Sequence, residues 1–167
     1  EWKATDSLAT TKITRAMPVG GTSLSTSNTF NLIADQNDGA GNYSTLINSQ
    51  AVTYTNNIWK TSNDYYWSGT ANKTISFYAY YPSTISNISH TAGSSPTLSY
   101  TVPDNVSDQI DIMTSTNNNV SGNTNSSTPL TFNHIFAAIQ FSVGSNGFGS
   151  GTISSISIGS VANSGTY

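Results

Sequence analysis

The sequence predicts an all-β protein that folds as an antiparallel β-sandwich. Apolar and polar residues alternate with a period of two in several segments, which is the pattern of a half-buried strand. Turn-forming residues separate these segments about every 10 to 20 residues. No long helical pattern lies between them, which disfavours a parallel α/β fold. With 167 residues, the chain has the length of one domain.

The alternating pattern marks five strands in the first two thirds of the chain. In order, their apolar residues are Phe30, Leu32 and Ala34; Val52 and Tyr54; Ile75, Phe77, Ala79 and Tyr81; Leu98, Tyr100 and Val102; and Ile110 and Ile112. Glycine, proline, serine and asparagine interrupt the pattern, and we predict turns or loops there. These segments are Gly20-Gly21, Asp38 to Gly41, Ser68-Gly69, Ala92 to Pro96, and the Asn-rich stretch from Asn117 to Asn125.

The last third of the chain has a less regular pattern. Between Leu130 and Val143 the apolar residues change from even to odd positions, which a regular strand does not allow. We predict a bulged strand; the alternative is one helical turn near Phe136. A Gly-rich connector at residues 144–151 follows. One more strand, either truncated or meant to pair elsewhere, is then predicted from Ile153, Ile156, Ile158 and Val161.

The composition excludes several classes of partner and site. Only 8% of the residues are charged and the net charge is -3, so no basic surface for nucleic acid is expected. The 11% aromatic content argues against disorder. The chain has no cysteine, which excludes disulfides and thiolate metal sites. It begins at Glu1 instead of Met, and we interpret it as a processed form whose export signal has been removed.

No combination of residues predicts an active site. A nucleophilic triad needs an imidazole base, and the two histidines are not accompanied by a Gly-x-Ser-x-Gly turn. We interpret His90 as a solvated loop histidine and His134 as a residue at the edge of the core that bonds to the backbone. We therefore expect no enzyme activity and no cofactor, and a hydrolase with an unrecognised site is the least favoured hypothesis.

The carboxylates do not predict a metal site either. The spacing of Asp104, Asp108 and Asp111 does not supply calcium ligands at alternate positions. Residues 35–39 begin like a calcium loop, but Gly39 falls where a ligand is needed, so a turn is the better interpretation.

Aromatic residues concentrate between Tyr65 and Pro82, on both faces of one predicted strand. In one interpretation they pack, with Phe77 and Tyr81 in the core and Tyr78 and Tyr80 covering a second layer. In the other, Trp59, Tyr78 and Tyr80 form an exposed surface on which sugars stack. The predicted core consists of Trp67, Phe77, Tyr81, Tyr100, Ile112, Phe132, Ile139 and Phe141.

Four motifs follow one another along the chain: Ile13-Thr14-Arg15-Ala16; Trp59 with Tyr65-Tyr66-Trp67; Phe77-Tyr78-Ala79-Tyr80-Tyr81-Pro82; and Asp111-Ile112-Met113 followed by Leu130-Thr131-Phe132-Asn133-His134. In this order and spacing they resemble the fimbrillin-like family, the lipoprotein-derived pilins and tip adhesins of type V pili in Bacteroidia-type anaerobes. The resemblance spans residues 13 to about 165. It implies structural roles for the motif residues Trp67, Phe77, Tyr81, Pro82, Asp111, Phe132 and His134.

The resemblance also implies a fold and a route of assembly. The fold is a transthyretin-like (Greek-key) sandwich, exported as a lipoprotein to the outer membrane and its fimbriae. An Arg-specific protease would cut between Arg15 and Ala16 and remove residues 1–15. Residues 16–167 would be the N-terminal domain, with a C-terminal domain missing from this chain. Loss of a strand exposes unpaired backbone groups that a donor strand from the next subunit can fill.

Three further expectations accompany the resemblance. Other pilin subunits are the expected partners, together with glycans or proteins on host or bacterial surfaces. Asp6-Ser7-Leu8 resembles an O-glycosylation signal, with Ser7 as the acceptor. The competing interpretations are an ordinary surface arginine at Arg15 and, for the whole chain, a glycan-binding module.

Overall fold

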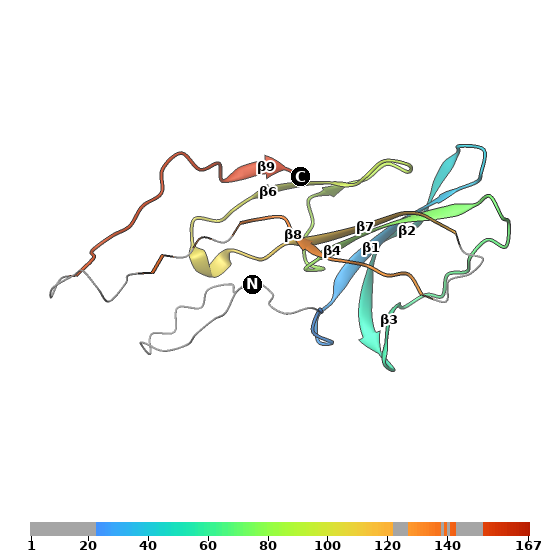
Figure 1. The fold of residues 1–167 in the computed structure, drawn as a ribbon, viewed down its shortest axis with the longest axis horizontal. Helices are drawn as coiled ribbons and strands as arrows, with labels where there is room; N and C mark the ends of the chain where they lie inside the picture. The colour runs from blue at the N-terminus through green and yellow to red at the C-terminus, as the bar shows by residue number, and fades with distance from the viewer. Residues whose placement is uncertain (1–22, 122–126, 138, 140, 143–151) are drawn as a thin grey trace.

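The computed structural model describes residues 23–121, 127–137, 139, 141–142 and 152–167. In these residues all the regular structure is β, apart from one short 3-10 turn, η1 (Val106–Asp108). The strands pair in an antiparallel manner and form two sheets that lie face to face (Figure 1). The predicted all-β antiparallel sandwich is therefore confirmed.

The larger sheet has six strands in the order β3-β2-β1-β4-β7-β8. They are β1 (Phe30–Asn37), β2 (Tyr43–Thr55), β3 (Ile58–Thr61), β4 (Thr74–Tyr81), β7 (Met113–Ser121) and β8 (Asn133–His134). The smaller sheet has the order β5-β6-β9. It consists of β5 (Ile88–Ser89), β6 (Thr97–Thr101) and β9 (Ser164–Thr166).

The hairpin between β2 and β3 turns on Asn56 and Asn57. Both residues have positive φ angles, 54° and 65°. A two-residue turn of this kind needs positive φ at both central positions, and asparagine adopts that conformation more readily than most residues. The turn therefore explains β3, which the apolar pattern alone did not predict.

The hairpin between β1 and β2 closes around Asp38. Its carboxylate accepts hydrogen bonds from the Asn42 side-chain amide at 2.7 Å and from the N–H of Ala40 at 2.8 Å. These bonds, with a third from the N–H of Asn42, hold the pKa of Asp38 below its ordinary value because they favour the charged form. The predicted turn is thus present, although Asp35 to Asn37 belong to β1 and not to the turn.

Two residues with positive φ, Ser49 and Asn119, lie at irregularities in the ladder. Between Leu32 and Ala34 of β1, the partner residues on β2 move three positions, from Gln50 to Ile47. Between β4 and β7 a step of two residues on β4 likewise corresponds to a step of three on β7. At this point the Asn119 N–H donates to Ser76 Oγ at 3.1 Å. These β-bulges let the strands bend while the apolar residues stay on their own face.

The first face of the large sheet carries one apolar cluster. Its buried members are Phe30, Leu32, Ala34, Ile47, Val52, Ile75, Phe77 and Ala79. Half-buried aromatic rings from loops and edge strands cover this cluster. Trp59 and Phe132 lie 5.4 and 5.1 Å from Phe30, and Trp67 lies 5.8 Å from Phe77, measured between ring centroids.

The opposite face carries a second cluster, which the small sheet covers. Its buried members are Ile33, Tyr78, Tyr80, Ile85, Leu98 and Ile112. Leu98 belongs to β6, and the half-buried Ile88 and Tyr100 of the small sheet pack against the same cluster. The aromatic residues of β4 therefore serve both layers, as the packing interpretation predicted.

Several sequence-based expectations are wrong. Ile110 and Ile112 precede β7 instead of forming a strand, and β7 itself runs into the Asn-rich stretch predicted as a loop. Pairing with the inner strand β4 satisfies the backbone of β7, so polar side chains are tolerated on it.

The structure also corrects the end of the predicted core. Ile139 and Phe141 are 63% and 54% exposed because β8 ends at His134 and the chain leaves the sheet there. The strand predicted from Ile153 to Val161 is not formed, and β9 lies beyond it at residues 164–166. Phe77 and Ile112 are buried as predicted, whereas Trp67, Tyr81, Tyr100 and Phe132 are half-buried.

Candidate functional site

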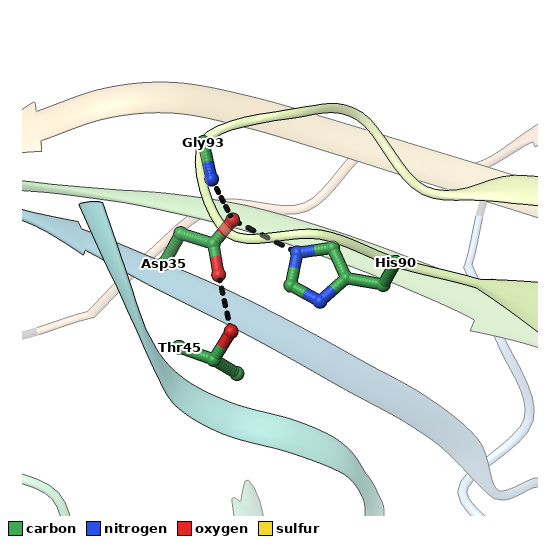
Figure 2. Close-up of polar contacts among 4 residues, drawn as sticks. All are labelled: Asp35, Thr45, His90 and Gly93. Carbon is green, nitrogen blue, oxygen red and sulfur yellow. Dashed lines mark hydrogen bonds and ion pairs between the residues drawn. The ribbon is translucent and has the colours of Figure 1, made fainter.

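The main polar site inside the sandwich is centred on Asp35 of β1 (Figure 2). Its side chain is fully buried, on the sheet face that the small sheet covers. Oδ2 accepts a hydrogen bond from the Gly93 N–H at 2.8 Å and lies 2.8 Å from Nε2 of His90. Oδ1 accepts from the Thr45 hydroxyl at 3.2 Å. One carboxyl group therefore joins β1, β2 and the loop between β5 and β6.

This arrangement corrects the interpretation of His90. The predicted solvated histidine has a side chain that is only 8% exposed, with its ring 6.3 Å from that of Tyr78. The loop comes close to β2 at Gly93, which has a φ of 84°; an added Cβ there would lie 2.7 Å from Cγ of Tyr43. Fifty-five residues separate Asp35 from His90, so local sequence pattern gave no sign of the pair.

The Asp35–His90 pair is suited to holding structure. Nucleophilic catalysis would require a hydroxyl bonded to the imidazole, with the carboxylate orienting the same ring. Within the described residues, the imidazole of His90 bonds to the carboxyl group and to no hydroxyl, and the Thr45 hydroxyl bonds to the same carboxyl group. The geometry supports a tie between the two layers and gives no support to a catalytic triad.

A second carboxyl–imidazole pair links two of the sequence motifs. Nδ1 of His134 lies 2.8 Å from Oδ1 of Asp111, with side chains 43% and 12% exposed. Next to this pair, His134 is paired with Met113 in the β7–β8 ladder, and the Ile135 N–H donates to the Ile112 carbonyl. The side-chain bond to Asp111 replaces the backbone bond that we predicted for His134. The two distant motifs thus form one structural unit that fixes β8 at the edge of the sheet.

The remaining motif residues have packing positions. Trp67 and Phe132 cover the first cluster, and Phe77 lies inside it. Tyr81 pairs with Met113 across β4 and β7, and the Pro82 carbonyl accepts a hydrogen bond from the Ile85 N–H. The structural roles implied for these residues are consistent with their contacts.

The structure gives little support to sugar stacking at the three aromatic residues named for it. Tyr78 and Tyr80 are only 9% and 6% exposed. Trp59 is half-buried, with its ring between those of Phe30 and Tyr54 at 5.4 Å from each. These rings are occupied by packing against other side chains, so they have little free surface for a ligand. Ser7, Arg15 and Ala16 lie outside the described residues.

An apolar, extended segment lies near the C-terminal end of the described chain. Ile153, Ile156, Ile158 and Val161 are each between 49% and 64% exposed. In Figure 1 this segment, drawn in red, runs apart from the two sheets until β9 pairs with β6. The edge strands are β3 and β8 in the large sheet and β5 and β9 in the small sheet. Edge strands and exposed apolar residues favour pairing with another chain.

The described residues hold no group of three or more His, Cys, Asp or Glu residues that could bind a metal ion. They also include no helix with the length and apolar character needed to cross a membrane. Asp108, one of the three aspartates considered above as calcium ligands, accepts hydrogen bonds from the Asn105 side-chain amide and the Ser107 hydroxyl.

Comparison with known proteins gives one match. A family model described as fimbrillin-like matches residues 14–167, which is most of the chain. No curated protein and no solved structure matches the chain significantly.

Proposed function

We propose that this chain, which belongs to the fimbrillin-like family, is a subunit of a cell-surface fimbria and assembles with other subunits by β-strand addition. The family consists of structural pilins. The two carboxyl–imidazole pairs of this chain likewise have structural roles, because each holds separate parts of the fold together. The subunit would be exported as a lipoprotein precursor and matured by cleavage after Arg15. The donated strand, the outer-membrane route and the cleavage are parts of this proposal.

The exposed apolar segment is the observation that carries the proposal of strand addition. Four branched apolar side chains at 153, 156, 158 and 161 are about half exposed or more. Burying one such side chain contributes roughly 1.5–3 kcal/mol, so covering four of them could drive association of subunits. An extended segment can also pair its backbone N–H and C=O groups with an edge strand of a neighbouring subunit.

Maturation and assembly can be tested together. The chain is digested with an Arg-specific protease under native conditions, its new N-terminus is sequenced, and the product is viewed by electron microscopy. We expect a new N-terminus at Ala16 and filaments that form only after digestion. The control is Arg15→Ala, which removes the cleavage point and should leave the chain intact and unassembled.

Two results would contradict this route. In one, the Arg-specific protease leaves the bond after Arg15, the one arginine of the sequence, intact while it cuts a reference substrate in the same reaction. In the other, the chain is cut after Arg15 but sediments as a monomer at high concentration. The second result would exclude self-assembly of this chain by removal of residues 1–15.

A further inference from the structure

Tyr66 is the most exposed large apolar or aromatic side chain in the described part of the protein. Its exposure is 83%, whereas its neighbours Tyr65 and Trp67 are much less exposed. It lies in the loop that joins β3 to β4. An aromatic ring in this position contributes little to the core, so its exposure calls for another explanation.

The loop holds Tyr66 outward because both of its neighbours are anchored. On one side, the Tyr65 hydroxyl donates to Oε1 of Gln50 on β2 at 2.8 Å, and Nε2 of the same Gln50 donates to Ser62 Oγ at 3.3 Å. On the other side, the Trp67 ring packs edge-on against Phe77. Because both flanking residues are already fixed, the loop loses less conformational entropy when a ligand binds to Tyr66. Binding is then less costly in free energy.

Apart from the aromatic Tyr65 and Trp67, the loop residues near Tyr66 in the sequence are polar and nearly uncharged. From Thr61 to Thr70, Asp64 is the one charged residue, and the others include hydroxyl and amide side chains. Some of these groups already shape the loop, since Thr61 donates to the Asn63 carbonyl and Ser68 accepts from the Thr70 N–H. An exposed ring in a loop rich in hydroxyl and amide residues suits a ligand with one apolar face and a polar rim.

We propose that Tyr66 is the stacking platform of a binding site for a neutral carbohydrate. The C–H face of a sugar ring would lie on the aromatic ring, and its hydroxyl groups would bond to the loop. A protein partner fits less well, because a stable interface buries at least about 1,200 Å² around several apolar anchors. Nucleic acid fits poorly because the sequence has only five Lys and Arg residues and a net charge of -3.

This site is independent of fibre assembly, so it is tested on the undigested, monomeric chain. The labelled protein is applied to an array of neutral glycans, and the affinity for the strongest hit is measured by calorimetry. We expect Tyr66→Ala to weaken binding about tenfold or more, and Tyr66→Phe, which keeps the ring, to remain within about threefold. Phe141→Ala, which removes another exposed aromatic ring, is the matched control and should bind like the unmodified protein.

The outcomes separate stacking from its alternatives. Tyr66→Ala should retain the thermal unfolding midpoint of the unmodified chain, so that loss of binding cannot be attributed to unfolding. Absence of binding to any neutral glycan would overturn the proposal. So would equal affinity in Tyr66→Ala, or equal losses in Tyr66→Phe and Tyr66→Ala. If Tyr66→Ala instead blocked cross-linking between copies of the chain, the residue would belong to a protein interface and the carbohydrate proposal would fail.

Discussion

Replacing Asp35 with alanine tests the polar tie between the two sheets. The change removes a fully buried carboxyl group together with its bonds to His90, Gly93 and Thr45. The backbone N–H of Gly93 and the largely buried imidazole would lose their partner. A buried donor left without an acceptor costs about 1–3 kcal/mol, which applies to the largely buried imidazole, and the part-buried Gly93 N–H adds a smaller loss because water can reach it. We therefore expect Asp35→Ala to lower the free energy of unfolding by roughly 2–4 kcal/mol.

Urea denaturation followed by tryptophan fluorescence measures this loss. In a chain of this size the same change should lower the thermal midpoint by about 10 °C, since each kcal/mol corresponds to about 2–4 °C. The matched control is Asp38→Ala, which removes a carboxylate from the exposed turn at the end of the same strand. A double-mutant cycle with His90→Ala isolates the coupling of the pair. A loss below about 1 kcal/mol for Asp35→Ala, the size of an ordinary surface substitution, would refute the argument.

Three more predictions follow from the structure. Gly93→Ala should lower the free energy of unfolding by about 1–3 kcal/mol in urea melts, because its φ of 84° and the ring that it faces leave no room for a Cβ; an unchanged midpoint would show that the loop does not approach β2 this closely. The pKa of Asp38, measured by carbon-13 NMR titration, should lie below its ordinary value and rise in Asn42→Ala, so the stabilisation from this carboxylate exists above the pKa of the unfolded chain and is lost as the pH falls through the folded pKa; a pKa that did not respond to Asn42→Ala would contradict the assigned cause. Ile112→Ala should cost about 2–5 kcal/mol because the side chain is fully buried, whereas Ile153→Ala should change the stability of the monomer by less than about 0.5 kcal/mol; similar losses at the two positions would mean that the apolar segment is packed in the monomer.

The strands that sequence could predict are those with an apolar residue at every second position. Phe30, Leu32 and Ala34 lie on one face of β1, and Ile75, Phe77 and Ala79 lie on the same face of the sheet from β4. Their alternation reflects burial directly. In β7, pairing with its neighbour stabilises the strand while much of its surface stays polar, so its sequence resembles a loop.

The polar sites were harder to predict because their partners are distant in sequence. His90 lies among serine, threonine and glycine residues. That local composition gives no sign that its side chain is buried and bonds to a carboxyl group on β1. Asp111 and His134 were each recognised as parts of family motifs, but only the pairing of β7 with β8 brings them together. The sequence does not distinguish Tyr66 from its aromatic neighbours, whereas in the structure Tyr65 and Trp67 have partners and Tyr66 is exposed.

Amide hydrogen exchange of the monomer and of the filament is the most direct test of assembly by strand addition. Exchange is followed at residues 152–163, with the inner strand β4 as an internal reference. If the apolar segment adds to a sheet of the next subunit, its amides exchange rapidly in the monomer and become strongly protected in the filament. Filaments in which residues 152–163 exchange as fast as in the monomer would contradict this role for the segment.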